Sequence, residues 1–438
     1  MRVSGLSSGF DWEDLVHQLM EVEKRPLVLL QNQVKRLDTE KEAWRNLNSS
    51  LLGLKTKAEA LSAPSLWDRM SAVSSNPAAA TAAADVQAEA GTYSLNVQAL
   101  ARAHRIASAQ QEDTVEGLGL EGQFTLQGAG EAVTIQVAAT DSLRDIRDKI
   151  ASSDAGAEAY IIDGRLIIGR SETGPEELLF SDPDGILEAL GLVEEGAFAH
   201  VLAEAQEAVF TVDGLTVTRS TNQVDDLIDG VTLNLGAVGL TEIVIDSDLD
   251  SMVEAVEAFV GKYNAVNEQM RSKSSREQGG ALVGDGTLRR LTSDLRQTLS
   301  GTIGEAAQGN YSALFQIGLS AADQTGRLEF SREEFLKAWE DDRESVKNLL
   351  TAQEGAFAQM SSRLDQVTRR RGLIDSRTDS LDRRQSLMVN QMERMEQRLE
   401  LRQASMFREF EALELALSRM QTQSAWLNQQ LSGLSGTK

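Results

Sequence analysis

The sequence contains no cysteine, and this absence excludes several kinds of chemistry at once. There can be no disulfide framework, no thiolate metal site and no cysteine nucleophile. Histidine is almost as scarce: only His17, His104 and His200 occur, and none has a partner at the spacing of a zinc site or a catalytic triad. Aromatic residues make up 5% of the chain, which is few for an enzyme with a ligand pocket. We therefore expect a protein that is not an enzyme and holds no metal or cofactor.

Basic residues are also in short supply. The 438 residues include 43 Lys and Arg against 67 Asp and Glu, a net charge of −24. The acidic excess lies between residues 109 and 360, whereas both ends are close to neutral. A surface of this sign repels phosphate backbones and anionic headgroups. Since the sequence also lacks a run of about 18 apolar residues, we expect no nucleic-acid partner and no insertion into a membrane.

The first of two heptad patterns lies near the N-terminus. Between Leu30 and Leu61 apolar positions follow one another at steps of three and four, interrupted only by Lys41. Their members include Leu47, Leu51 and Leu54. This spacing predicts a helix with a coiled-coil seam.

A shorter amphipathic helix is expected before this seam. Its apolar face would carry Leu15, Leu19 and Val22. Asp11 or Asp14 would cap its N-terminus, because a short acidic side chain accepts the unpaired N–H groups there. Pro26 lacks an N–H and clashes with the preceding turn, so it is expected to kink or break the chain between the two helices.

The second heptad pattern repeats an apolar residue every seven positions near the C-terminus. Its members are Met392, Leu399, Met406, Leu413, Met420, Leu427 and Leu434. The pattern predicts a helix from about Asp375 to Leu431, roughly 85 Å long at 1.5 Å per residue. The second seam position changes register between Met395 and Phe410, which varies the packing geometry along the helix. A methionine-rich seam is typical of a coiled-coil core and also of an adaptable groove for other proteins, and both interpretations stay open.

Between the helical ends the apolar period changes to that of strands. Residues 71–108 and 208–247 are expected to form an inner β-rich lobe, and the acidic insert 109–207 an outer α+β lobe with a helix near 143–150. Asp-Gly pairs at 163–164 and 213–214 lie between apolar runs and predict tight hairpin turns.

The nested order of these segments predicts an α+β fold. Long terminal α-helices would form a coiled-coil leg plus a helical bundle, with the two β-rich lobes inserted between them. The leg would consist of residues 1–70 and a C-terminal coiled-coil helix, 366–438, that pairs with them. Residues 248–365 would form a helical domain.

One motif imitates a calcium site. Asp246, Asp248, Asp250 and Glu257 have the spacing of an EF-hand loop, but Ser251 occupies the sixth position, where the sharp turn needs glycine. A strand that leads into a helix capped by Asp248 or Asp250 is the simpler interpretation. A metal-dependent enzyme at these residues is the alternative, and it would show calcium-dependent melting.

Two further motifs have an ordinary interpretation. The glycine-rich residues 279–286 lack the Lys-Ser/Thr pair of a phosphate loop, so they are expected to connect two helices. The run 369–371, three arginines, is interpreted as a solvated charged face and not as a nucleic-acid patch, because acidic residues surround it.

Four segments together carry a resemblance to one family. They are Ser-Gly-Leu-Ser-Ser-Gly-Phe-Asp at 4–11 with 15–20, Gly-Thr-Tyr-Ser-Leu-Asn-Val at 91–97, Phe-Thr-Val-Asp-Gly at 210–214 with 229–233, and Met-Phe-Arg-Glu-Phe at 406–410 with 420–427. On the basis of these segments, the chain resembles the flagellar hook-associated protein 2 family over nearly its whole length. The acidic insert 109–207 resembles the family least.

The resemblance implies a filament cap. It implies export through the flagellar type III apparatus without a cleavable signal peptide, an extracellular location at the filament tip, and assembly into a homo-oligomeric ring that helps flagellin fold and insert and prevents its leakage. Hook-filament junction proteins and an export chaperone are implied as further partners. The terminal helices would order on assembly, when other chains cover their seams.

The residues expected to make subunit or filament contacts are those of the two seams. They are Leu15, Leu19, Leu47, Leu51, Leu54, Met406, Phe410, Leu413, Met420 and Leu427. Heptads of this kind permit several oligomer states, so the ring stoichiometry stays open. The alternative function is a surface adhesin that binds host glycans or mucin through the outer lobes.

Overall fold

The computed structural model of the chain describes residues 11–300, 310–353 and 355–435, excluding the side chains of residue 300 and of residues 430–435. The chain divides into two compact units. Unit 1 consists of Met1–Pro64 and Ser251–Lys438, and unit 2 of Ser65–Asp250. The mixture of long terminal helices and a β-rich middle confirms the α+β prediction.

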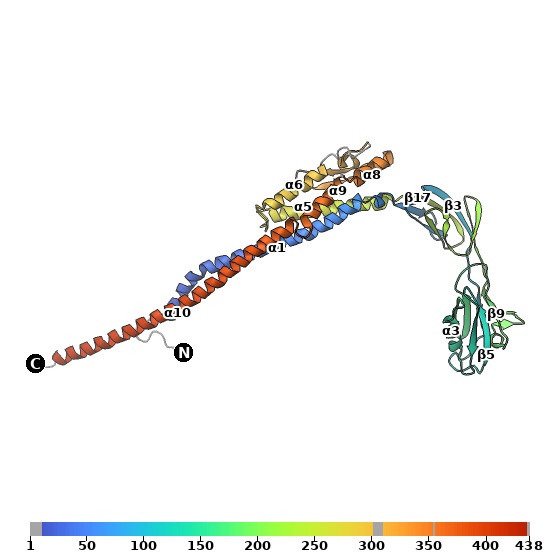
Figure 1. Cartoon of the computed structure of the whole chain (residues 1–438), viewed down its shortest axis with the longest axis horizontal. Helices are drawn as coiled ribbons and strands as arrows, with labels where there is room; N and C mark the ends of the chain where they lie inside the picture. The colour runs from blue at the N-terminus through green and yellow to red at the C-terminus, as the bar shows by residue number, and fades with distance from the viewer. Residues whose placement is uncertain (1–10, 301–309, 354, 436–438) are drawn as a thin grey trace. The chain divides into compact units, whose positions relative to one another are not determined.

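Unit 1 is built around two long helices. They are α1 (Trp12–Ser62) and α10 (Leu373–Ser435), of 51 and 63 residues. They lie side by side and run in opposite directions, because Trp12 stacks on Phe410 whereas Lys41 pairs with Asp382 (Figure 1). At 1.5 Å per residue α10 is about 95 Å long, and the predicted long C-terminal helix is confirmed.

The prediction that two separate helices meet at Pro26 is wrong. Helix α1 is continuous from Trp12 through Pro26 to Ser62, and Asp11 caps it by accepting the N–H of Asp14 at 3.1 Å. Pro26 is exposed, while Met20 and Leu27 on either side of it are buried against the partner helix. The packing of this seam therefore outweighs the single helical hydrogen bond that proline removes.

The rest of unit 1 is a helical bundle with one small hairpin. Its elements are α5 (Leu249–Ser274), α6 (Gly286–Ser300), η1 (Leu314–Ile317), β18 (Leu319–Ala321), β19 (Leu328–Phe330), α7 (Arg332–Asp341), α8 (Arg343–Thr351) and α9 (Ala356–Thr368). Phe259 of α5 and Phe357 of α9 meet edge to face at 4.9 Å in its interior. The β18–β19 hairpin was not predicted.

The glycine-rich residues 279–286 connect α5 to α6, as predicted. Asp285 fixes the end of this connection, because one of its oxygens accepts the N–H groups of Thr287 and Leu288 at the start of α6. Its other oxygen accepts from Arg377 of α10 at 2.9 Å. The turn thus serves helix capping and anchoring. The exposed arginines 369–371 lie in the turn between α9 and α10.

Unit 2 contains two buried clusters, and the inner cluster lies between two antiparallel sheets. One sheet has the order β1-β17-β3-β13-β14 and the other β15-β16-β2. The strands are β1 (Met70–Ser74), β2 (Ala80–Ala84), β3 (Gly91–Ala99), β13 (Ala208–Val212), β14 (Leu215–Arg219), β15 (Gln223–Ile228), β16 (Val231–Leu235) and β17 (Gly239–Ser247). Val97, Phe210, Leu233 and Ile243 are among the side chains that the two sheets bury together. The short helix α2 (Pro64–Trp67) precedes β1.

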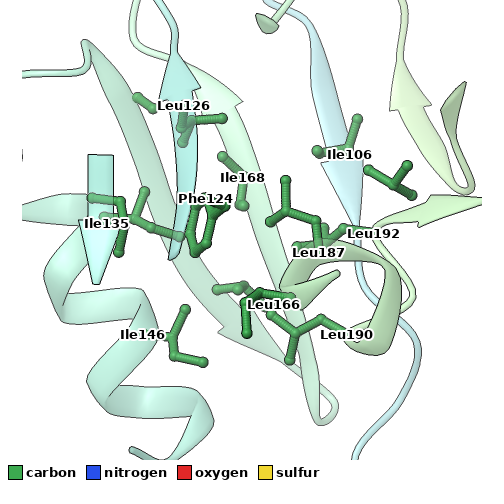
Figure 2. Packing of buried hydrophobic residues seen from close by; sticks show 14 of the residues in the cluster. Ile106, Phe124, Leu126, Ile135, Ile146, Leu166, Ile168, Leu187, Leu190 and Leu192 are labelled. Atoms are coloured by element: carbon green, nitrogen blue, oxygen red, sulfur yellow. The ribbon is translucent and has the colours of Figure 1, made fainter. Parts of the chain in front are cut away.

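The outer cluster is formed by residues of the acidic segment and by Ile106, which the sequence pattern assigns to the inner lobe. Its sheets have the orders β12-β4-β8-β7 and β6-β5-β9, with a separate pair β10-β11. The elements are β4 (Arg105–Ala107), β5 (Gly122–Gln127), β6 (Val133–Val137), α3 (Leu143–Ala151), β7 (Ala157–Ile162), β8 (Arg165–Arg170), β9 (Leu179–Ser181), α4 (Ile186–Ala189), β10 (Val193–Glu194), β11 (Ala197–Phe198) and β12 (Val201–Ala203). Figure 2 shows Phe124 of β5 among Ile135, Ile146 and Leu166, side chains of three different elements.

Both predicted hairpin turns are present. Asp163-Gly164 joins β7 to β8 with φ of 49° and 70°, and Asp213-Gly214 joins β13 to β14 with φ of 49° and 83°. Two successive positive φ values are those of a type I′ turn, which favours Asp-Gly because glycine has no Cβ to clash.

The imitation of an EF-hand is a strand leading into a helix, as expected. Strand β17 ends at Ser247 and α5 begins at Leu249, directly after Asp248. Among the described residues no group of three or more His, Asp or Glu side chains comes together where it could hold a metal ion.

Candidate functional site

The predicted seam of α1 lies against the chain's own helices. Seven of its positions, from Leu37 to Leu61, are buried where α1 packs on α9 and α10. Lys41, which interrupts the seam, donates from Nζ to Asp382 Oδ1 at 2.8 Å and to Gln385 Oε1 at 2.9 Å. The hydrogen bond to Asp382 raises the pKa of the Lys41 ammonium above its usual value. A charged residue is tolerated in this seam because α10 supplies its partners.

Four of the residues expected to contact other subunits need a correction, three on α1 and Met406 on α10. Leu47, Leu51 and Leu54 are each 0% exposed. Their surroundings are helices of the same chain, so the seam does find an intrachain partner. A second copy has no surface of these side chains left to touch. Their contribution is to hold α1 on the bundle.

A second ion pair fixes the same part of α1. Lys55 Nζ donates to Asp365 Oδ1 of α9 at 2.7 Å. This hydrogen bond raises the pKa of the Lys55 ammonium and lowers the pKa of the Asp365 carboxyl. Both shifts favour the charged forms, so the pair is ionised at neutral pH and joins α1 to α9.

The N-terminal part of α1 packs on α10. Its contacts form a buried cluster to which Val16, Met20, Leu27, Leu399 and Met406 belong. Beyond these, the Trp12 ring stacks on the Phe410 ring with centroids 4.8 Å apart. Met406 is thus buried within the chain and Phe410 is partly covered by it. The pair of helices α1 and α10, including the part of α10 past Phe410, is called the leg below.

The leg has a second apolar face on α1 that the chain itself leaves open. Leu15 and Leu19 are 40% and 41% exposed, whereas their neighbours Val16 and Met20 are buried against α10. The two residues belong to a row with Val22 and Leu29, also exposed. Large apolar side chains in a row on a helix are a common feature of protein interfaces.

Past Phe410, α10 continues beyond the first residue of α1. This segment, residues 411–435, is called the tail below. Leu413, Met420 and Leu427 of the predicted seam are 50%, 63% and 50% exposed. Their seven-residue spacing is that of a helix face that packs against a neighbour, but in this chain the face is exposed. Leu434, the last seam position, lies outside the residues whose side chains are described.

Five of the ten predicted contact residues therefore remain accessible, two on α1 and three on the tail: Leu15, Leu19, Leu413, Met420 and Leu427. Sequence reasoning did not separate them from the buried ones, because a heptad pattern shows that a face will be covered but not by which chain. The row Leu15, Val22, Leu29 has its own seven-residue spacing, which is the sequence pattern that indicates a second face.

In the described ranges, no helix combines the length and hydropathy needed to cross a bilayer.

Models of protein families match three parts of the chain. The C-terminus of flagellar hook-associated protein 2 matches residues 205–422, and its N-terminus matches residues 8–104. The flagellin hook IN motif matches residues 123–170. This third match lies in the acidic segment, where the residues alone gave the least resemblance.

Relatives cover most of the chain. A-type flagellar hook-associated protein 2 of Pseudomonas aeruginosa is 29% identical over 417 residues, 85% of each chain. Flagellar hook-associated protein 2 of Escherichia coli K12 is 27% identical over 375 residues, 79% of each chain. The crystal structure of the D1-D2-D3 domains of the flagellar cap protein FliD from E. coli has a TM-score of 0.60 at 27% identity, and covers 78% of this chain and 99% of that one.

Proposed function

The chain belongs to the flagellar hook-associated protein 2 family, that of the flagellar cap proteins, and we propose that it forms an oligomeric cap at the tip of the filament. In this position it promotes the folding and insertion of arriving flagellin and prevents flagellin from leaking into the medium. The protein works through packing surfaces and carries out no covalent chemistry.

The exposed apolar end of the leg is the observation that supports this proposal. Leu413, Met420 and Leu427 present one continuous row on a helix that has no cover from its own chain within the described residues. Full burial of an exposed side chain of this size gains about 1.5–3 kcal/mol, and these half-exposed side chains gain roughly half of that. The segment is therefore built to associate with other subunits.

The location follows from the same proposal. A cap at the filament tip is extracellular, and we propose that the chain reaches it through the flagellar export apparatus without a cleavable signal peptide. An export chaperone and the hook-filament junction proteins are proposed as partners on the basis of the family. The relatives described above are named for the flagellum and not for adhesion, so the glycan-binding alternative is not taken further.

A test of the cap function replaces the exposed row of the tail by charge. In a strain that carries Leu413→Asp together with Met420→Asp, we expect shortened or absent filaments and flagellin in the culture medium. Flagellin in the medium is measured by immunoblot, and filaments are counted by electron microscopy. Because both side chains are exposed, the subunit itself should remain folded, which circular dichroism of the purified variant checks.

The matched control places the same charges elsewhere. Leu202→Asp together with Leu215→Asp changes two leucines that are 56% and 73% exposed in unit 2. This variant is expected to keep filament length closer to that of the wild type. Normal filaments and no leaked flagellin in the tail variant would contradict the proposed function.

A further inference from the structure

We propose that the tail of one copy packs on the second apolar face of α1 in another copy. This inference rests on the proposed function, which it makes specific: it names which two surfaces of the leg meet in the cap. The tail surface is the row Leu413, Met420 and Leu427, and the α1 surface is the row Leu15, Val22 and Leu29.

Both rows are exposed in the subunit. On α1 the three side chains are 40%, 56% and 63% exposed, and on the tail 50%, 63% and 50%. The α1 row points away from α10, because the side chains that face α10 are the buried set Val16, Met20 and Leu27. The leg therefore has two apolar rows in need of cover.

The two rows cannot meet within one chain. Trp12 lies beside Phe410, and Lys41 lies beside Asp382, so Leu15 lies opposite about residue 407 and Leu29 opposite about residue 393. Helix α10 is continuous to Ser435, so the tail runs away from the start of α1. At 1.5 Å per residue Met420 lies roughly 20 Å further along α10 than the position opposite Leu15. Only a second copy can bring a tail to the α1 row.

The rows match one another in length and spacing. Leu15, Val22 and Leu29 follow at seven-residue steps, and so do Leu413, Met420 and Leu427. Helices with equal heptad rows pack along their whole length without a change of register. Val22 and Met420 are the central residues, so they meet whether the two helices are parallel or antiparallel.

The composition of the tail fits burial between helices. From residue 411 to residue 435 the charged side chains are Glu411, Glu414 and Arg419 only. A helix meant to stay in water carries more charge on its faces than this. The low charge favours another apolar helix as the occupant, and the α1 row of a neighbour supplies one.

Cross-linking tests the contact directly, because the natural chain has no cysteine. Two full-length variants, Val22→Cys and Met420→Cys, are purified separately, mixed in equal amounts and oxidised. We expect a disulfide-linked heterodimer on a non-reducing gel, several-fold above its yield from the control mixture of Val73→Cys with Met420→Cys. Val73 is 63% exposed in unit 2 and reports random collision.

Three further pairs are used, two to set the orientation and one to check the fold. Leu15→Cys mixed with Leu427→Cys reports antiparallel packing, and Leu15→Cys mixed with Leu413→Cys reports parallel packing. Trp12→Cys combined with Phe410→Cys in one chain should close within the monomer, because these rings are in contact. That product shows that the leg is intact in cysteine variants.

A heterodimer yield equal to that of the control mixture overturns the inference. So does efficient closure of Leu6→Cys with Met420→Cys inside one chain, because the chain's own N-terminal residues would then cover the tail. So does a Met420→Cys cross-link to flagellin, and not to a second copy, in assembled filaments.

If rings still form and flagellin is still retained while the Val22–Met420 link is absent, the inference fails and the proposed function stands. If neither rings nor retention are found, both fail.

Discussion

Trp44 is the largest side chain buried in the seam between α1 and the bundle, and it leaves one polar group without a partner. Its exposed fraction is 0%, and the indole Nε1–H has no hydrogen-bond acceptor among the described residues. Burial of an N–H without a partner costs about 1–3 kcal/mol. The ring is therefore retained for its volume and not for its polar atom.

We predict that Trp44→Ala and Trp44→Phe differ widely. The alanine variant loses the whole ring and should lower the free energy of unfolding by about 3–5 kcal/mol. The phenylalanine variant leaves a smaller cavity and also removes the unpaired N–H, so its cost should be about 1 kcal/mol. Chemical denaturation followed by circular dichroism measures both. Equal losses would show that the N–H is hydrogen-bonded and contributes to stability.

Asp141 makes the outer cluster sensitive to acid. Its Oδ2 accepts from Lys149 Nζ and from the N–H of Ala138, the latter at 2.8 Å. The hydrogen bond from Lys149 is the main reason why the pKa of Asp141 is lower than its ordinary value of 3.8. The ionised carboxylate therefore stabilises the folded state. This contribution is fully present above the ordinary pKa and is lost as the pH falls through the lowered one.

Asp141→Asn should remove that dependence in part. We expect the variant to melt at a lower temperature than the wild type at pH 7, and the difference to shrink as the pH is lowered from about 5 towards 2. Thermal melts at several pH values measure this. Asp154→Asn is the control, since it removes an exposed carboxylate that no described lysine or arginine contacts. A constant difference between Asp141→Asn and the wild type at all pH values would contradict the assignment.

At the scale of elements, the sequence predicts which segments form helices and hairpins, but not which other element packs against each helix. The seven-residue repeat and the Asp-Gly turns depend on local rules, so the long C-terminal helix and both hairpins were correct. Whether a seam is covered by the same chain depends on the register between α1 and α10, which no local pattern contains. For this reason Leu47 and Leu413 looked alike in the sequence but are buried and exposed in the structure. The β18–β19 hairpin was missed because its strands have only three residues each.

The uninterrupted path of α1 through Pro26 leads to a stability prediction. Proline in a helix interior costs about 3 kcal/mol, because it removes one hydrogen bond and crowds the preceding turn. Proline also restricts the unfolded chain, which returns about 0.4–1 kcal/mol. We therefore expect Pro26→Ala to raise the free energy of unfolding by about 2 kcal/mol, measured by urea denaturation at 222 nm.

A second exposed position of α1 supplies the control for Pro26→Ala. Val28 is 49% exposed on the same helix, and Val28→Ala changes only helix propensity. Its gain should be about 0.5 kcal/mol. If Pro26→Ala gains no more than this, the helix in solution already bends at Pro26 and the hydrogen bond is not recovered.

At the scale of the whole molecule, the nested order of the chain divides it into two compact units. Unit 1 gathers both ends of the sequence around α1 and α10, while unit 2 is one continuous segment. The ends of that segment lie next to each other, because Met70 pairs with Ser247 and the N–H of Asp248 donates to the carbonyl of Arg69 at 2.9 Å. An insert with adjacent ends can fold without straining its host.

This arrangement predicts that residues 65–250 fold alone. The fragment holds both the inner and the outer clusters, and its 186 residues are enough to bury a core. We expect it to melt cooperatively, at a temperature within a few degrees of one transition of the full chain, because no strand of either cluster comes from unit 1. Calorimetry of the fragment and the full chain compares the two. A fragment without a cooperative transition would mean that the β-rich unit needs the helices of unit 1 to fold.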